Sequence, residues 1–74
     1  MNYDIDTDEG MANAVQWTTE HFARLKDGGV WMVPRSGTLV RVRHATKTAT
    51  LHNTTPDPSI ARVIKAMGWT VTEK

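Results

Sequence analysis

The sequence contains no cysteine, so neither a disulfide nor a thiolate metal site can brace the fold. It has no apolar run that approaches the roughly 20 residues of a membrane span. Its first ten residues are acidic and lack the basic and then apolar order of a secretion signal. We therefore expect a cytoplasmic protein that does not bind a membrane. The chain has 74 residues, which predicts one small domain without a large catalytic cleft.

Neither sign of charge predominates in the whole chain. Nine lysines and arginines stand against eight acidic residues, which gives a formal net charge of +1. The charges are nevertheless segregated: residues 1–29 carry six acidic and two basic side chains, whereas residues 30–72 carry six basic and one acidic. Segregated charge is typical of an interaction face. A small domain must also place its charges somewhere on its surface, so both interpretations stay open.

Two helices are expected from the apolar spacing. An acidic arm over residues 1–8, predicted to be flexible, leads into a helix over about 9–26. Asp6 or Asp8 would cap this helix, and the two glycines at 28–29 would end it. A second helix is expected to begin with Asp57 as its cap and Pro58 at its first position, and to end at Gly68.

Three short strands are expected between the helices, at about 30–33, 38–43 and 48–52, and a fourth is expected at 69–72. The predicted fold is a small two-layer α+β domain over residues 9–74 with the order α-β-β-β-α(-β). Its sheet is expected to be antiparallel, with both helices on one face.

The strand registers follow from the turns. A three-residue turn that ends at Gly37 would place Pro34 opposite Thr38 and Met32 opposite Val40. The next hairpin is expected to pair Val42 with Ala49. These registers gather one apolar set under the helices: Val30, Met32, Val40, Val42, Ala49 and Leu51. The opposite, outer face would then carry Trp31, Val33, Leu39, Arg41, Arg43, Thr48, Thr50 and His52.

This outer face is the candidate partner-binding surface. Trp31 would lie across from Arg41, where a cation–π contact can form. Tryptophan and arginine are enriched among residues that dominate binding energy, and they also suit stacking on unpaired bases. The candidate partner-binding residues are Trp31, Arg41, Arg43, Arg35, Lys47, Val33 and Leu39. The alternative is that the arm or Trp69 covers this face.

Catalytic, metal and cofactor motifs receive no support. Asp4, Asp6 and Asp8 have the first spacings of a calcium loop, but the required glycine and glutamate are missing at its sixth and twelfth positions. The three histidines are not expected to converge on one ion. The two serines lack recognisable His and Asp partners, and no glycine-rich phosphate-binding motif is present. We expect no enzymatic activity, no metal and no cofactor.

The runs GGVWMVPRSGT at residues 28–38 and AMGW at residues 66–69 resemble small uncharacterised proteins of tailed bacteriophages. The resemblance covers about two thirds of the chain. It implies an accessory factor that acts early in infection by binding a host protein, such as RNA polymerase, a nucleoid protein or a defence complex. It carries over no individual site residue.

Three functional hypotheses follow. The first is a non-enzymatic protein that modulates, for example inhibits, a host protein through the outer face of its sheet. The second is direct binding of DNA or RNA through the same basic face, which predicts a steep loss of affinity with salt. The third is a structural protein that associates with itself through Trp31, Val33 and Leu39, so that monomer and homodimer both stay open.

Overall fold

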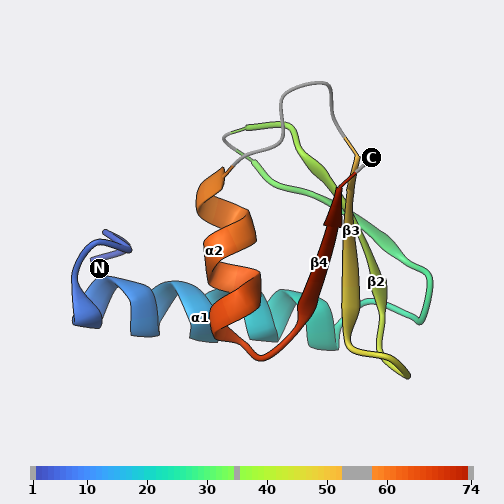
Figure 1. Cartoon of the computed structure of the whole chain (residues 1–74), viewed down its shortest axis with the longest axis horizontal. Coiled ribbons are helices and arrows are strands. Elements are labelled where there is room, and N and C mark those ends of the chain that lie inside the picture. The colour runs from blue at the N-terminus through green and yellow to red at the C-terminus, as the bar shows by residue number, and fades with distance from the viewer. Residues whose placement is uncertain (1, 35, 53–57, 74) are drawn as a thin grey trace.

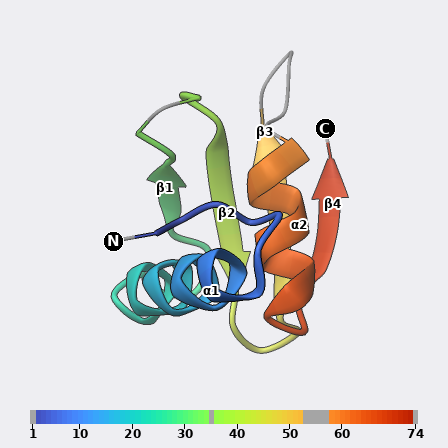
Figure 2. The same cartoon turned by 90° about the vertical axis from the view of Figure 1, so that its left-hand side faces the viewer.

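Both helices lie on one face of a four-stranded sheet in a computed structural model that describes residues 2–34, 36–52 and 58–73 (Figure 1, Figure 2). The elements are α1 (Asp8–Ala23), β1 (Val30–Met32), β2 (Leu39–Arg43), β3 (Thr48–His52), α2 (Pro58–Ala66) and β4 (Thr70–Glu73). The predicted two-layer α+β class with its order of elements is therefore confirmed.

The sheet is mixed, because its fourth strand runs parallel to its neighbour. The strand order is β1-β2-β3-β4, with antiparallel pairing from β1 to β3 and parallel pairing between β3 and β4. An antiparallel sheet was expected throughout. The difference arises because α2 returns the chain to the end of the sheet at which β3 begins, so that β4 runs in the same direction as β3. Parallel neighbouring strands require a crossover connection of this kind.

The first helix begins one residue earlier than expected and has a different cap. Thr7 has extended backbone angles, and its hydroxyl accepts a hydrogen bond from the amide of Gly10 at 3.0 Å. The prediction that Asp6 or Asp8 caps the helix is wrong, since Asp8 is already its first residue. Asp8 and Glu9 instead lie in the first turn, where negative charge favours the helix dipole.

The second helix ends as the sequence predicts. Gly68 has a φ of 89°, a left-handed conformation that glycine adopts without strain. Its amide donates to the Lys65 carbonyl at 3.0 Å, and the Trp69 amide donates to the Ile64 carbonyl at 3.3 Å. These two bonds form a Schellman motif, which turns Trp69 back towards the core. The predicted cap Asp57 lies outside the described residues.

The core lies between the helices and the sheet. The buried side of α1 is a column at four-residue spacing, and α2 contributes a wider apolar stripe. The core residues are Phe22, Val33, Val40, Val42, Ala49, Leu51, Ile60, Ala61 and Ile64, with Trp31, Trp69 and Val71 packed against them. The buried column of α1 is Gly10, Ala14, Thr18 and Phe22.

One of the two predicted hairpin registers is correct. The β2–β3 hairpin pairs Val42 with Ala49 and Val40 with Leu51, as expected. The β1–β2 register was wrong by one residue, because Trp31, and not Met32, lies opposite Val40. A slip of one residue moves every side chain of a strand to the other face. Trp31 and Val33 therefore point under the helices.

The turn and the tryptophan explain the observed register. Val33 donates to the Thr38 carbonyl at 2.9 Å, so the loop has four residues and not three. Proline has no N–H and could not donate this bond from position 34. The same register half-buries the large indole of Trp31 beside Phe22, with ring centroids 6.2 Å apart. Burial of an aromatic side chain is a large apolar gain.

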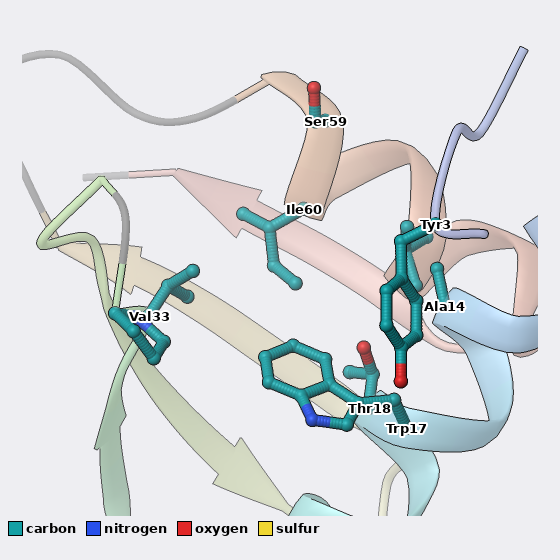
Figure 3. Close-up of a pocket in the computed structure, with 9 residues that line it drawn as sticks. Tyr3, Ala14, Trp17, Thr18, Val33, Ser59 and Ile60 are labelled. Atoms are coloured by element: carbon teal, nitrogen blue, oxygen red, sulfur yellow. The ribbon is translucent and has the colours of Figure 1, made fainter. Parts of the chain in front are cut away.

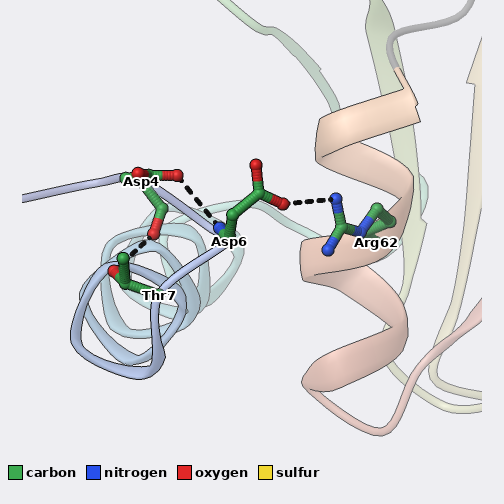
Figure 4. A network of polar contacts seen from close by, with 4 residues as sticks. All are labelled: Asp4, Asp6, Thr7 and Arg62. Atoms are coloured by element: carbon green, nitrogen blue, oxygen red, sulfur yellow. Dashed lines mark hydrogen bonds and ion pairs between the residues drawn. The ribbon is translucent and has the colours of Figure 1, made fainter.

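The N-terminal arm runs along the helix side of the domain. Asp6 accepts from Arg62 of α2 at 3.3 Å, and its own amide donates to the Asp4 side chain at 3.0 Å (Figure 4). The Asn13 amide group donates to the Asn2 carbonyl at 2.8 Å. The ion pair is exposed and contributes only about 0.2–1 kcal/mol. Flexibility of the arm in solution stays a prediction.

Candidate partner-binding surface

The structure divides the predicted binding residues between two faces. Leu39, Arg41 and Arg43 alternate with buried valines along β2 and are exposed on the outer face. The placement of Trp31 and Val33 on that face is wrong, since both belong to the inner layer. The alternative that the arm or Trp69 covers the outer face is also wrong. The arm lies on the helix side (Figure 2), and Trp69 packs on Phe22.

The remaining two predicted residues have different outcomes. Lys47 is exposed in the turn between β2 and β3, with a φ of 50°. Its carbonyl accepts a hydrogen bond from the Thr70 amide at 2.9 Å, which joins the turn to β4. Lys47 precedes Thr48, the cross-strand partner of Arg43, and so lies at the same end of the sheet as that arginine. Arg35 lies outside the described residues.

The rings around Trp31 show that it lies on the helix side of the sheet and not on the outer face. The indole stacks on His21 with centroids 4.9 Å apart, and it meets the ring of Trp17 edge-on at 5.3 Å. The predicted cation–π pair with Arg41 is absent, because the residue opposite Arg41 is Val30. Trp31 thus joins α1 to the edge strand β1 and stabilises the fold.

The observed β1–β2 register places other apolar side chains on the outer face in place of Trp31. Met32 is 59% exposed, Val30 is 44% exposed and Leu39 is 40% exposed. Met32 and Leu39 are direct cross-strand partners, and Val30 lies two residues from Met32 on the same side of β1. These three side chains and the two neighbouring arginines form what we call the outer-face patch: Val30, Met32, Leu39, Arg41 and Arg43.

The arginines of the outer-face patch are available for contacts. Within residues 2–34, 36–52 and 58–73, no acidic side chain forms an ion pair with Arg41 or Arg43. Arg41 lies between Val30 and Thr50, and Arg43 lies beside Thr48. Across β3 and β4 the face continues as cross-strand threonine pairs, Thr48 with Thr70 and Thr50 with Thr72. The described outer face is therefore apolar at β1 and Leu39 and cationic at Arg41 and Arg43, and beyond them it carries the threonines and His52, which lies opposite Leu39.

Val30 and Met32 are the functional candidates that sequence reasoning missed. The run from Val30 to Val33 is apolar at every position, so alternation cannot show which side chains face the core. The available signal was Pro34, whose missing N–H favours Val33 as the last residue that pairs with β2.

The described histidines and acidic residues do not form a metal centre. No group of three or more potential ligands comes together in the described part of the chain. The Nε2 atom of His44 lies 2.8 Å from the Leu25 carbonyl, and its ring meets Trp69 edge-on at 5.7 Å. Among the described helices, none is long and apolar enough to cross a membrane.

Comparison with known proteins gives no relative from which a function could be transferred. No family model, curated protein or solved structure matches the chain.

Proposed function

We propose that this chain is a non-enzymatic binding protein that engages another macromolecule through the outer-face patch. The observation that carries the proposal is the exposed Met32–Leu39 pair beside two arginines that form no ion pair with a described residue, on a face that neither helix covers (Figure 1). Methionine and arginine are enriched in protein interfaces. Exposed apolar side chains that touch one another and are rimmed by polar groups are typical of a binding site.

The charge of the patch indicates the chemistry of the partner. Acidic groups on the partner would complement Arg41 and Arg43, and an apolar surface between those groups would pack against Met32 and Leu39. We therefore propose an acidic protein surface with an apolar centre. In keeping with the resemblance to phage accessory proteins, the partner would be a host protein of the transcription, nucleoid or defence machinery. Complementary charge would fix the orientation of binding and speed association.

The nucleic-acid hypothesis has less support than the sequence suggested. Base stacking needs aromatic side chains beside the basic groups, and Trp31 was the predicted stacking residue. No tryptophan, tyrosine or phenylalanine lies on the described strands of the outer face. The net charge of +1 also provides little electrostatic attraction to phosphates.

The hypothesis of self-association through this face also has less support than the sequence suggested. The predicted contact used Trp31 and Val33, which belong to the inner layer. A two-fold dimer through the outer-face patch would bring Arg41 and Arg43 of both copies together. Like charges at close range oppose such a dimer, so we propose a partner of different sequence.

The test is capture of a partner from bacterial lysate by the full chain with a photo-crosslinking amino acid at position 32. We expect one crosslinked acidic protein that persists after nuclease treatment. The double substitution Arg41→Glu/Arg43→Glu should lower the yield at least tenfold, because it turns attraction into repulsion. Lys65→Glu, an exposed charge reversal on α2, should leave the yield unchanged.

Two outcomes contradict the proposal. One is an equal yield from the chain with both arginines reversed. The other is loss of the crosslink on nuclease treatment, which would establish the nucleic-acid hypothesis instead.

A further inference from the structure

A second site lies on the opposite side of the molecule from the outer-face patch. It is a pocket of about 310 Å³ between the N-terminal arm, α1, the end of β1 and α2 (Figure 3). Its walls are mostly apolar and come from segments that are distant in the sequence. Residues that line it include Tyr3, Trp17, Thr18, Val33, Ile60 and Val63.

The size of the pocket indicates the size of its ligand. An apolar cavity of about 150 Å³ accommodates one benzene ring, so this pocket is large enough for two fused rings. It also lies at the small end of the range of about 300–1,000 Å³ that ligand pockets occupy. Among the described lining residues, none carries a carboxylate, an ammonium or a guanidinium group. A charged ligand would therefore lose its hydration without compensation, which favours a neutral one.

One polar side chain of the pocket is buried without a hydrogen-bond partner among the described residues. Thr18 is 1% exposed, and its hydroxyl oxygen bonds to no group in residues 2–34, 36–52 and 58–73. In Figure 3 this hydroxyl points towards the space between the rings of Trp17 and Tyr3, whose centroids are 6.2 Å apart. Buried hydroxyl groups are nearly always hydrogen-bonded, so an orphan of this kind calls for an explanation. A hydroxyl can both donate and accept, and a ligand with either function would satisfy it.

The N-terminal arm contributes Tyr3 to the lining of the pocket. Tyr3 is 47% exposed, and the arm is attached through exposed hydrogen bonds and the Asp6–Arg62 ion pair. Exposed ion pairs contribute little to stability. Because the Thr18 hydroxyl has almost no accessible surface, a ligand that bonds to it would have to displace the Tyr3 ring outward.

We propose that this pocket binds a small neutral bicyclic aromatic molecule through one hydrogen bond to the Thr18 hydroxyl. The ring system would pack against Trp17, Val33 and Ile60, where aromatic and aliphatic surfaces favour a flat apolar ligand. The class is that of indole and related fused heteroaromatic compounds with a single polar group. The site is independent of the outer-face patch.

The experiment uses two probes of the same shape, indole with its N–H and indene without it. Each is titrated into the ¹⁵N-labelled full chain, and amide and indole N–H shifts are followed by NMR. We expect saturable shifts at Trp17, Thr18 and Val33 in the millimolar range or below. The substitution Thr18→Val, which keeps the shape and removes the hydroxyl, should weaken indole binding about fivefold and leave indene binding unchanged.

A second variant tests the location. Ala14 lines the pocket, so Ala14→Leu should fill it and weaken both probes at least tenfold, whereas Lys65→Ala on the surface of α2 should change neither. Three results would overturn the proposal: no saturable shift up to the solubility limit, the same effect of Thr18→Val on both probes, or undiminished binding to a folded Ala14→Leu chain.

Discussion

Replacement of Trp31 by alanine should remove about 3 kcal/mol from the free energy of unfolding, and with it most of the folded population at moderate urea concentrations. Large-to-small aromatic substitutions in a core cost about 3–5 kcal/mol, and Trp31 is only half-buried, which places it at the lower end. This loss is a large part of the total stability, because the free energy of unfolding of native proteins is only about 0.05–0.15 kcal/mol per residue. Urea denaturation followed by circular dichroism measures it.

The neighbouring residue is the matched control. Met32 is 59% exposed, so Met32→Ala should change the free energy of unfolding by no more than about 0.5 kcal/mol. The two substitutions lie on adjacent residues of one strand and remove large side chains from opposite faces. If Met32→Ala were the more destabilising of the two, β1 would have the register that we predicted from sequence, and the outer-face patch would not exist.

The double substitution Met32→Ser/Leu39→Ser should abolish partner capture while the fold stays intact. These side chains form a direct cross-strand pair at the centre of the exposed apolar surface. Central apolar anchors of interfaces can each contribute 2 kcal/mol or more, so we expect affinity to fall at least about 30-fold. The measurement is the yield of captured partner, together with urea denaturation of the same variant.

A control on the same face keeps this result specific. Thr70→Ala/Thr72→Ala changes two exposed residues of β4, at the far edge of the sheet from Met32. We expect capture by this variant to be reduced less than threefold. Equal losses from both double substitutions would mean that the partner contacts the face without the apolar anchor that we propose.

The fold was largely predictable because its signals are local or repeated. The α2 helix has its proline at the start and Gly68 at the end, and the observed helix matches both. The β2–β3 hairpin was predictable because Val40 and Val42 alternate with exposed residues, and Ala49 and Leu51 alternate with polar, half-buried residues. A slip of one residue would move one of these sets to the other face.

The direction of β4 and the start of α1 were not predictable from these signals. Among the described strands β4 pairs with β3 alone, and its alternation is compatible with either strand direction. The crossover through α2 decides it. At α1, Thr7 lies between two aspartates that are equally good caps by residue type. The arm decides between them, since the Thr7 hydroxyl also donates to the Asp4 carbonyl at 2.8 Å.

The candidate site was only partly predictable. Leu39, Arg41 and Arg43 could be placed because they alternate with core valines on a five-residue strand. Strand β1 has three residues, all apolar, and its register depends on the length of a loop and on a ring cluster formed with α1. The pocket beside Thr18 was not predictable at all, because it combines the arm, both helices and the end of β1.

The register of β1 decides which side chains the outer face presents, and a nuclear Overhauser experiment on Trp31 measures it directly. The indole protons should give cross-peaks to the rings of Trp17 and His21, whose centroids lie 5.3 and 4.9 Å away. Cross-peaks from the same indole protons to the side chain of Arg41, with none to Trp17 or His21, would place Trp31 on the outer face and contradict the proposed patch.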